Sequence, residues 1–317
     1  MPRATLVTAA LTALLLTGCS AAPPAPPSPT PSAPAPATPI SQPSPTSAAP
    51  TPTPSPTPAA TEPTQPEELT IDSVWNFRDV AGTAQGLPLA DGGRMARGVV
   101  FRSGKLKGIS AADRRSLIDA GITDIFDLRT DEVARRTPDP TIGDIAYHLV
   151  NIYAVRSYTD PEAANAEQAK VQREELYRKF VADRKQRARI GGLLKDIARA
   201  DGPVIIHCSE GKDRTGWVSA VLQLIAGVDE QTVMEEYLLS NERRADLVAK
   251  DVAKVRRSQG RTAAEIRQVR LEVYDRFLQA ALDELTDRYQ DVDGYVTDGL
   301  GLSPAVLDAL RERLILR

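Results

Sequence analysis

The sequence predicts an α/β fold in which a central, mostly parallel sheet is flanked by helices. Short apolar runs have the length and the β-branched content of buried strands, and helical patterns of apolar residues lie between them. Further helical patterns follow the last of these runs and continue to the C-terminal end. Strands that alternate with helices are typical of parallel sheets, because each parallel connection must cross one face of the sheet.

The first half of the domain contains three predicted strands and one helix. Residues 99–101 form a short strand, and Ser110 with Asp113 begins an amphipathic helix that ends near Gly121. Residues 123–128 and 145–150 follow as strands.

The second half begins with a charged helical pattern over residues 162–200, which divides into two pieces. Residues 204–207 are a short β-branched run that predicts a buried strand. After Thr215 the apolar residues repeat at helical spacing until Gly227 closes the helix, and Asp229 caps the next one.

The C-terminal part is predicted to be helical. Thr262 and Glu265 form a capping box before one long helix, whose apolar stripe runs from Ile266 to Leu285 and is attributed to packing in the core or under a lid. Ser303 followed by Pro304 begins a last helix that ends at about Leu314.

Residues 1–19 have the layout of an export signal. Arg3 precedes an uncharged, mostly apolar run over residues 4–18, which is shorter than the ~20 residues needed to span a membrane. Residues 16–19, Leu-Thr-Gly-Cys, resemble the lipobox of bacterial lipoproteins, in which the cysteine is acylated and becomes the new N-terminus. The resemblance implies that the chain is secreted across the cytoplasmic membrane and that a lipid on Cys19 is its one attachment to the cell surface. A plain cleaved signal is the alternative.

Residues 20–67 are predicted to form a disordered linker, and residues 68–317 a folded domain. Of the 25 prolines, 18 fall between Ala22 and Pro66, in a segment with too few large apolar groups to offset the entropy lost on ordering. The whole chain has 39 Lys and Arg against 42 Asp and Glu, a net charge of −3. That balance gives no electrostatic reason to expect nucleic acid as a partner.

Residues 207–216, His-Cys-Ser-Glu-Gly-Lys-Asp-Arg-Thr-Gly, join the predicted buried strand to the next helix. Free backbone N–H groups and the helix dipole at such a junction favour an anion, and they lower the pKa of the Cys208 thiol below its usual ~8.5. Arg214 can return to the mouth of the loop and hold two phosphate oxygens, while Gly211 lets the loop turn. The segment therefore predicts a site that presents a phosphate monoester to the Cys208 sulfur.

The segment resembles the signature loop of the cysteine-dependent protein tyrosine phosphatases, and its Gly-Lys-Asp-Arg-Thr-Gly ending resembles a bacterial branch of that family. The resemblance covers nearly all of residues 70–316, because the pattern of that branch is also matched at residues 75–81, 101–103, 127–129, 237–238, 240–241 and 294–295. It implies a phosphatase α/β sandwich with helical lid segments over the pocket.

The resemblance also implies a role for each residue of the loop. Cys208 attacks phosphorus and forms a phosphocysteine, Arg214 stabilises the phosphoryl oxygens, and Thr215 hydrogen-bonds to the sulfur. Asp213 is the candidate general acid, with a carboxylate that only offsets the helix dipole as its alternative. Asp127 near a strand end is the second candidate, with a structural role as its alternative.

The other residues of the loop are expected to bind substrate: Ser209, Glu210, Gly211 and Lys212. Lys212 is expected at the pocket rim, where its charge would favour polyanionic substrates; a solvated lysine is the alternative. The expected substrates are phosphotyrosine proteins, with phosphoserine, phosphothreonine and phosphoinositides as further candidates. Neither a cofactor nor a metal is expected, since two histidines and two cysteines supply no metal cluster.

Four charged residues allow two interpretations, pocket lining or ion pairs that tie the loop down. The second is favoured for most of Arg78, Asp79, Arg102 and Arg129. His207 is expected to order the loop, and His148 to be structural.

Two other functions remain open from the sequence. Sulfur transfer or arsenate reduction also uses a cysteine loop, but the Asp-Arg-Thr-Gly ending fits phosphate chemistry better, and arsenate reduction normally needs a resolving cysteine, which residues 68–317 lack. A non-catalytic phosphate-binding module is the second alternative.

Overall fold

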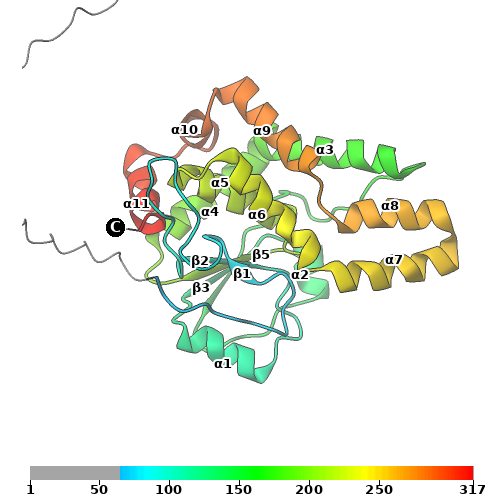
Figure 1. Cartoon of the computed structure of the whole chain (residues 1–317), viewed down its shortest axis with the longest axis horizontal. Coiled ribbons are helices and arrows are strands. Elements are labelled where there is room, and N and C mark those ends of the chain that lie inside the picture. Colours follow the sequence, from blue (N-terminus) through cyan, green and yellow to red (C-terminus); the bar gives the residue numbers. More distant parts are fainter. Residues whose placement is uncertain (1–64, 317) are drawn as a thin grey trace, which may run out of the picture. The chain divides into compact units, whose positions relative to one another are not determined.

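The computed structural model of the chain describes residues 65–316. The signal peptide with its lipobox at Cys19 and the linker up to residue 64 lie outside the described residues, and both stay predictions. The fold contains a five-stranded sheet in the order β1-β2-β5-β3-β4, made of β1 (Arg78–Asp79), β2 (Val100–Ser103), β3 (Asp124–Asp127), β4 (Ala146–Leu149) and β5 (Val204–His207) (Figure 1). β2, β5, β3 and β4 are parallel, and only the short β1 pairs antiparallel, with β2. The predicted α/β fold with a mostly parallel sheet is therefore confirmed.

Alternate side chains of the central strands point to opposite faces of the sheet, and helices cover each face. Phe101, Ile125 and Ile205 join a smaller core with α1 (Ala111–Asp119). Phe126 and Ile206 belong to the larger core on the other face. In Figure 1, α1 lies on one side of the sheet, whereas α4 (Arg184–Arg199), α5 (Arg214–Ala226) and α6 (Glu230–Glu242) lie on the other. Strand β5, which precedes the loop over residues 208–213, is thus buried on both faces and paired on both edges.

Most helices begin and end where the sequence places them. Ser110 caps α1 by accepting a hydrogen bond from Asp113 N, and Asp229 caps α6 in the same way. Gly227 ends α5 in the left-handed conformation, with φ of 93°. The pattern over residues 162–200 is α3 (Ala166–Ala182) followed by α4, and the last helix is α11 (Pro304–Leu314). A short helix, α2 (Asp131–Arg136), follows β3.

The single long helix predicted from the Thr262 capping box to Leu285 is wrong. The chain instead forms α8 (Arg261–Leu271) and α9 (Asp275–Tyr289), and Gly260 rather than Thr262 precedes α8. The break is fixed by tertiary contacts, because the backbone N–H and C=O of Val273 both bond to the Asn241 side chain. The apolar stripe continues through the break, and periodicity alone therefore did not reveal it.

A further helix, α7 (Ala245–Gln259), was not predicted. It packs along α8, and the two helices, called the hairpin below, extend away from the sheet (Figure 1). After α9 the chain forms α10 (Val292–Gly294) and a π-helix, η1 (Tyr295–Gly299), before α11. Each helix within residues 65–316 is too short or too polar to span a bilayer.

Candidate active site

The candidate site lies in the loop between β5 and α5, at the carboxyl end of the central strand. Cys208 directly follows β5, and Asp213 is the residue before the first turn of α5. Both flanking elements are rigid, since β5 is fully buried and α5 is buried along nearly its whole length. The loop therefore places the N-terminus of a buried helix, with its free N–H groups and positive dipole end, beside the Cys208 sulfur.

Gly211 gives the loop its turn, and neighbouring side chains fix its peptide orientation. Its φ is 68°, and a Cβ atom there would lie 2.5 Å from the backbone of Ser103, so only glycine fits. The Gly211 carbonyl accepts hydrogen bonds from Asn76 Nδ2 at 2.8 Å and Arg102 Nη2 at 3.1 Å. Because the C=O and N–H groups of a trans peptide point in opposite directions, the N–H of Lys212 is directed to the other side of the loop. Such N–H groups form an anion-binding nest.

The Cys208 side chain is buried, with 1% of its surface exposed. Burial alone would raise the pKa of its thiol, but the positive charge of Arg214 and the polar groups of Thr215 outweigh burial and lower that pKa below its ordinary value. This setting favours the thiolate, the form that acts as a nucleophile. The Thr215 hydroxyl has no hydrogen-bond partner among residues 65–316, so its pairing with the sulfur stays a prediction.

Arg214 is half-buried at the start of α5. Its guanidinium carbon lies 4.6 Å from the centre of the Tyr153 ring, and its Nη1 donates to the Leu128 carbonyl at 3.4 Å. Its Nε has no hydrogen-bond partner among residues 65–316. Tyr153, which the sequence analysis did not single out, thus supports the guanidinium by a cation–π contact and leaves donors for a phosphate.

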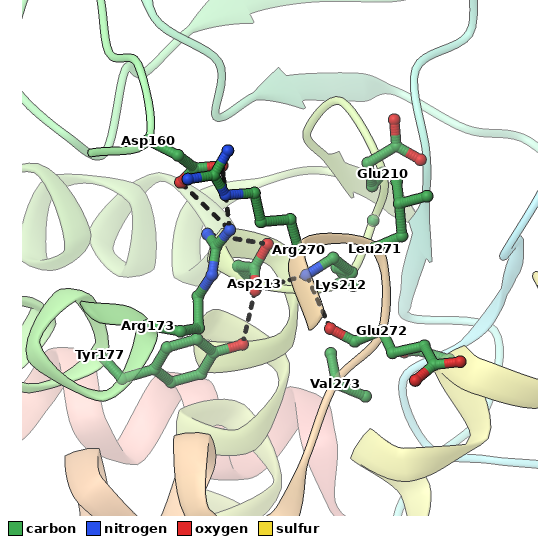
Figure 2. A network of polar contacts seen from close by, with 12 residues as sticks. Asp160, Arg173, Tyr177, Glu210, Lys212, Asp213, Arg270, Leu271, Glu272 and Val273 are labelled. Carbon is green, nitrogen blue, oxygen red and sulfur yellow. Dashed lines mark hydrogen bonds and ion pairs between the residues drawn. The ribbon is translucent and has the colours of Figure 1, made fainter. Parts of the chain in front are cut away.

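Asp213 is held as a carboxylate by three neighbours. Its Oδ1 accepts hydrogen bonds from Lys212 Nζ at 2.9 Å and from the Tyr177 hydroxyl at 3.1 Å. Its Oδ2 lies 3.8 Å from Arg173 Nη1 (Figure 2). Burial alone would raise the pKa of the Asp213 carboxyl, but the charges of Lys212 and Arg173 outweigh burial and lower it to about 2.

Lys212 does not lie at a pocket rim, and that prediction is wrong. Only 1% of its surface is exposed, and its Nζ donates to Asp213 and to the Glu272 carbonyl at 3.1 Å. Burial lowers the pKa of Lys212 to about 8. The lysine points inward because the non-helical segment between α8 and α9 supplies a carbonyl acceptor beside Asp213.

The remaining loop residues face the surface more than Lys212 does. Ser209 and Glu210 are half-buried; the Ser209 carbonyl accepts a hydrogen bond from Lys105 N, and the Glu210 carboxylate pairs with Arg244. Arg244 also donates to the Leu271 carbonyl at the end of α8. The loop is therefore connected to the base of the hairpin by Glu210 as well as by Lys212.

Residues 69–316 match the model of the family described as "Tyrosine phosphatase family". The chain belongs to the tyrosine phosphatase family. It is 28% identical over 280 residues to the triple specificity protein phosphatase PtpB of Mycobacterium tuberculosis, an alignment that covers 77% of this chain and 98% of that protein. It is 26% identical over 247 residues to a Cupriavidus necator protein named provisionally as a tyrosine-protein phosphatase, with 76% of this chain and 86% of that protein covered. A tyrosine-protein phosphatase of Nostoc commune is 42% identical over 43 residues, only 14% of this chain.

The protein is accordingly a cysteine-based tyrosine phosphatase family enzyme, and the predicted family and activity class are confirmed.

Asp127, the second candidate acid, lies in a cluster behind the phosphatase loop. Its carboxylate is fully buried and accepts hydrogen bonds from Arg129 Nε and Nη2 and from the Tyr147 hydroxyl at 2.7 Å. Burial alone would raise its pKa, but the hydrogen bonds from Arg129 outweigh burial and lower it. These contacts favour the structural role for Asp127.

The same cluster brings together the three metal-ligand-type groups of Asp127, Asp139 and His207, whose ligand atoms lie within 4.8 Å of one another. The guanidinium of Arg129 already bonds to both carboxylates, so a cation occupies the centre of the cluster. His207 is fully buried, with Nδ1 3.3 Å from the Cys208 carbonyl. This contact agrees with its expected role in ordering the loop.

The other singled-out charges tie the phosphatase scaffold together. Arg78 forms a buried ion pair with Glu236 on α6, and Arg102 lies 3.9 Å from the same carboxylate. Asp79 accepts hydrogen bonds from the backbone N–H groups of Ala81 and Gly98. His148 pairs with Asp124 at 2.8 Å on the exposed edge strand β4. The predicted ion-pair role fits Arg78, Arg102 and Arg129 better than pocket lining does.

Proposed function

We propose that this phosphatase hydrolyses phosphate monoesters in two steps through a phosphocysteine at Cys208, with Asp213 as general acid and base. The observation that carries the proposal is the setting of the Cys208 sulfur, whose thiol pKa is lowered by Arg214 and Thr215 at the N-terminus of a buried helix. A sulfur anion in that place needs no further activation to attack a phosphoryl group.

In the first step the Cys208 thiolate attacks phosphorus while the bond from phosphorus to the leaving oxygen breaks. Arg214 and the loop N–H groups bind the three non-bridging oxygens, where charge accumulates. Asp213 donates a proton to the leaving oxygen, so that an alcohol or phenol departs and a thiophosphate ester remains.

The low pKa of Asp213 raises the question of where its proton comes from. At a pKa of about 2, Asp213 carries no proton at neutral pH in the absence of substrate. A phosphoryl group in the loop brings negative charge close to the carboxylate, and like charge raises a carboxyl pKa. We propose that the substrate enters as a monoanion and that its proton passes to Asp213.

In the second step the Asp213 carboxylate takes a proton from a water molecule whose oxygen attacks phosphorus. The bond between sulfur and phosphorus breaks, inorganic phosphate is released, and the thiolate of Cys208 is restored. The Thr215 hydroxyl is proposed to donate a hydrogen bond to the sulfur and so to stabilise the departing thiolate.

The experiment uses the purified enzyme with p-nitrophenyl phosphate and a chelator. The wild type should release p-nitrophenol, and Cys208→Ser should lose turnover while its circular dichroism spectrum is unchanged. Mass spectrometry of a rapidly quenched reaction should find one phosphoryl group on the peptide that contains Cys208. Turnover by Cys208→Ser at the wild-type rate would overturn the proposal.

For the substrate class we propose phosphotyrosine as the main target, with phosphoserine, phosphothreonine and phosphoinositides also accepted. The support is the similarity to PtpB, whose name describes a triple specificity phosphatase. The buried position of Lys212 removes the charge at the rim that the sequence analysis had invoked for polyanions. A panel of the four substrate types at equal concentration tests the range, and exclusive hydrolysis of phosphotyrosine would contradict it.

We also propose that the enzyme is exported and attached to the cell surface by a lipid on Cys19, the only membrane attachment we expect. The support is the Leu-Thr-Gly-Cys sequence after the apolar N-terminal run. Metabolic labelling with a radioactive fatty acid should mark the wild type and not Cys19→Ser. An unlabelled wild type found in the soluble fraction would contradict the proposal.

A further inference from the structure

Arg173 on α3 lies between two carboxylates, that of Asp213 in the catalytic loop and that of Asp160 in the segment before α3 (Figure 2). Its Nη2 donates to both oxygens of Asp160, at 3.1 and 3.2 Å, and its Nη1 lies 3.8 Å from Asp213 Oδ2. The Arg173 side chain is 7% exposed, and its pKa is raised because the two carboxylates outweigh its burial. The guanidinium is therefore always charged, and Asp160 holds it from the side opposite to Asp213.

The two oxygens of Asp213 have different partners. Oδ1 is held by Lys212 Nζ and by the Tyr177 hydroxyl, which in turn contacts the Tyr237 hydroxyl at 2.7 Å. Oδ2 faces the guanidinium of Arg173 without a short hydrogen bond. Oδ2 is thus the oxygen that is less constrained by donors, and the guanidinium of Arg173 is the cation that it faces.

Both cationic partners of Asp213 are connected to the C-terminal end of α8 in the hairpin, Lys212 directly and Arg173 through Asp160. Lys212 Nζ donates to the Glu272 carbonyl just after α8. Arg270 on α8 lies 3.9 Å from Asp160 Oδ2 and donates to the Pro161 carbonyl (Figure 2). A displacement of α8 would therefore alter Lys212 directly and Arg173 through Asp160.

We propose that Arg173 is the positioning residue of Asp213, and that Arg270 and the Glu272 carbonyl of the hairpin complete this arrangement. The inference rests on the proposed function in one respect, the role of Asp213 as the acid. The groups that protonate the leaving oxygen are then correctly placed only when the end of α8 lies against the catalytic loop. Attack by Cys208 depends on the loop itself. Arg173 acts through Asp213 and makes no contact of its own with the reacting atoms in this account.

A structural ion pair between α3 and the segment at Asp160 is the competing explanation. A structural role would lower the amount of folded enzyme and reduce the rate with every substrate equally. A role through the acid depends on the substrate, because a poor leaving group needs the proton and a good one does not. The two explanations therefore differ in the leaving-group dependence of kcat/KM, which reports the step in which the leaving group departs.

The experiment measures kcat/KM for a series of aryl phosphates on the full chain, from p-nitrophenyl phosphate, with a good leaving group, to phenyl phosphate, with a poor one. Asp213→Asn should lose on the order of 100-fold more activity with phenyl phosphate than with p-nitrophenyl phosphate, the usual contribution of a general acid. Arg173→Gln should show the same trend at about 10-fold, and Arg173→Lys should recover part of the loss.

Two variants test the connection to the hairpin. Asp160→Asn and Arg270→Gln should shift the leaving-group dependence in the same direction as Arg173→Gln, by about 2- to 5-fold, since each acts one contact further away. Arg276→Gln is the matched control, because Arg276 on α9 pairs with Glu167 and Glu174 of α3 without contacting the catalytic loop. It should leave the leaving-group dependence unchanged.

The double variant Arg173→Gln/Asp213→Asn decides whether Arg173 acts through the acid. It should depend on the leaving group no more steeply than Asp213→Asn alone. If Asp213→Asn has the wild-type dependence, the acid role in the proposed function fails, and this inference fails with it. If Asp213→Asn is steeper but Arg173→Gln and Arg173→Lys lower all rates by one factor, the inference alone is overturned and the proposed function stands.

Discussion

Helix α5 and the hairpin of α7 and α8 are both next to the catalytic loop, but they are built in opposite ways. In α5 only Arg214 and Leu224 are not buried, and the helix lies against the central strands. In α7 only Val248 is buried, and the hairpin extends away from the sheet (Figure 1). The nucleophile and its arginine are thus attached to an element that cannot move without unfolding, whereas the contacts of the acid reach an element with little buried surface.

The largest difference between the two regions should appear when a large side chain is removed from each. Trp217 in α5 is fully buried, with its ring 6.3 Å from that of Phe180 and 5.8 Å from that of Tyr295. Trp217→Ala should lower the free energy of unfolding by about 3–5 kcal/mol, and Leu247→Ala on α7 by less than about 0.5 kcal/mol. Urea denaturation followed by circular dichroism measures both. Equal losses would mean that the hairpin is as much a part of the folding unit as α5.

Ion pairs provide a second comparison. Glu236 is 3% exposed and compensates the buried charges of Arg78 and Arg102, whereas Asp251 and Arg267 in the hairpin are 40% and 42% exposed. Glu236→Gln should cost about 3–5 kcal/mol of unfolding free energy, because it leaves buried guanidinium charge uncompensated. Asp251→Asn should cost less than about 1 kcal/mol. Thermal melting of the two variants sharpens the contrast, and a melting temperature of Glu236→Gln at the wild-type value would contradict it.

Two glycines with positive φ allow the effect of backbone strain on stability to be distinguished from its effect on catalysis. Gly211 in the loop has a φ of 68° and the Ser103 backbone beside it, whereas Gly260 in the hairpin turn has a φ of 88° and open space around it. Alanine should add roughly 1–3 kcal/mol of strain at either position. Only Gly211→Ala should also shift the loop, lowering kcat/KM by about 100-fold, as small displacements of catalytic groups do. Steady-state kinetics on both variants checks this, and a matching loss in Gly260→Ala would show that the hairpin turn controls chemistry.

The smallest expected effect concerns how the free energy of unfolding changes with pH, which should have opposite signs for Asp79 and Asp251. Burial raises the pKa of Asp79 in the scaffold to about 6, whereas a hydrogen bond from Arg267 lowers the pKa of Asp251 in the hairpin. A raised carboxyl pKa stabilises the folded state at low pH, and that stability is lost as the pH rises through about 6.

Wild type should therefore lose about 1–3 kcal/mol relative to Asp79→Asn between pH values of about 4 and 6.5. Relative to Asp251→Asn, the wild type should lose stability when the pH changes in the opposite direction, that is, as it falls below about 4. Unfolding free energies at a series of pH values test both signs. A difference from Asp79→Asn that stays flat over this range would show that Asp79 is ionised throughout.

The sequence predicted those parts of the protein that depend on local patterns. The strands, the cap of α1 at Ser110 and the end of α5 at Gly227 follow from period, capping and turn chemistry, and the catalytic loop follows from the spacing of Cys208 and Arg214. What could not be predicted depends on contacts between distant segments. The Val273 break, the inward position of Lys212 and the stacking of Tyr153 under Arg214 are of this kind.

One missed residue did leave a signal in the sequence. Arg173 stands within the buried face of α3, between Ala169 and the later pair Leu176 and Tyr177. A charged residue at a position where helical spacing calls for an apolar one must be paired in the interior. The pattern could have identified Arg173 as a buried arginine, but not that Asp213 and Asp160 would be its partners, since these come from separate segments.

The strand order also determines when the active site can form during synthesis. β5 is inserted between β2 and β3, although about a hundred residues separate it from β2 along the chain. A growing polypeptide that ends before Val204 exposes two unpaired apolar strand edges, a state prone to aggregation. A ribosome or an export channel that holds back the chain from Val204 onward would therefore delay Cys208, Asp213 and Arg214 together. A chaperone that shields those edges would be most useful at that stage.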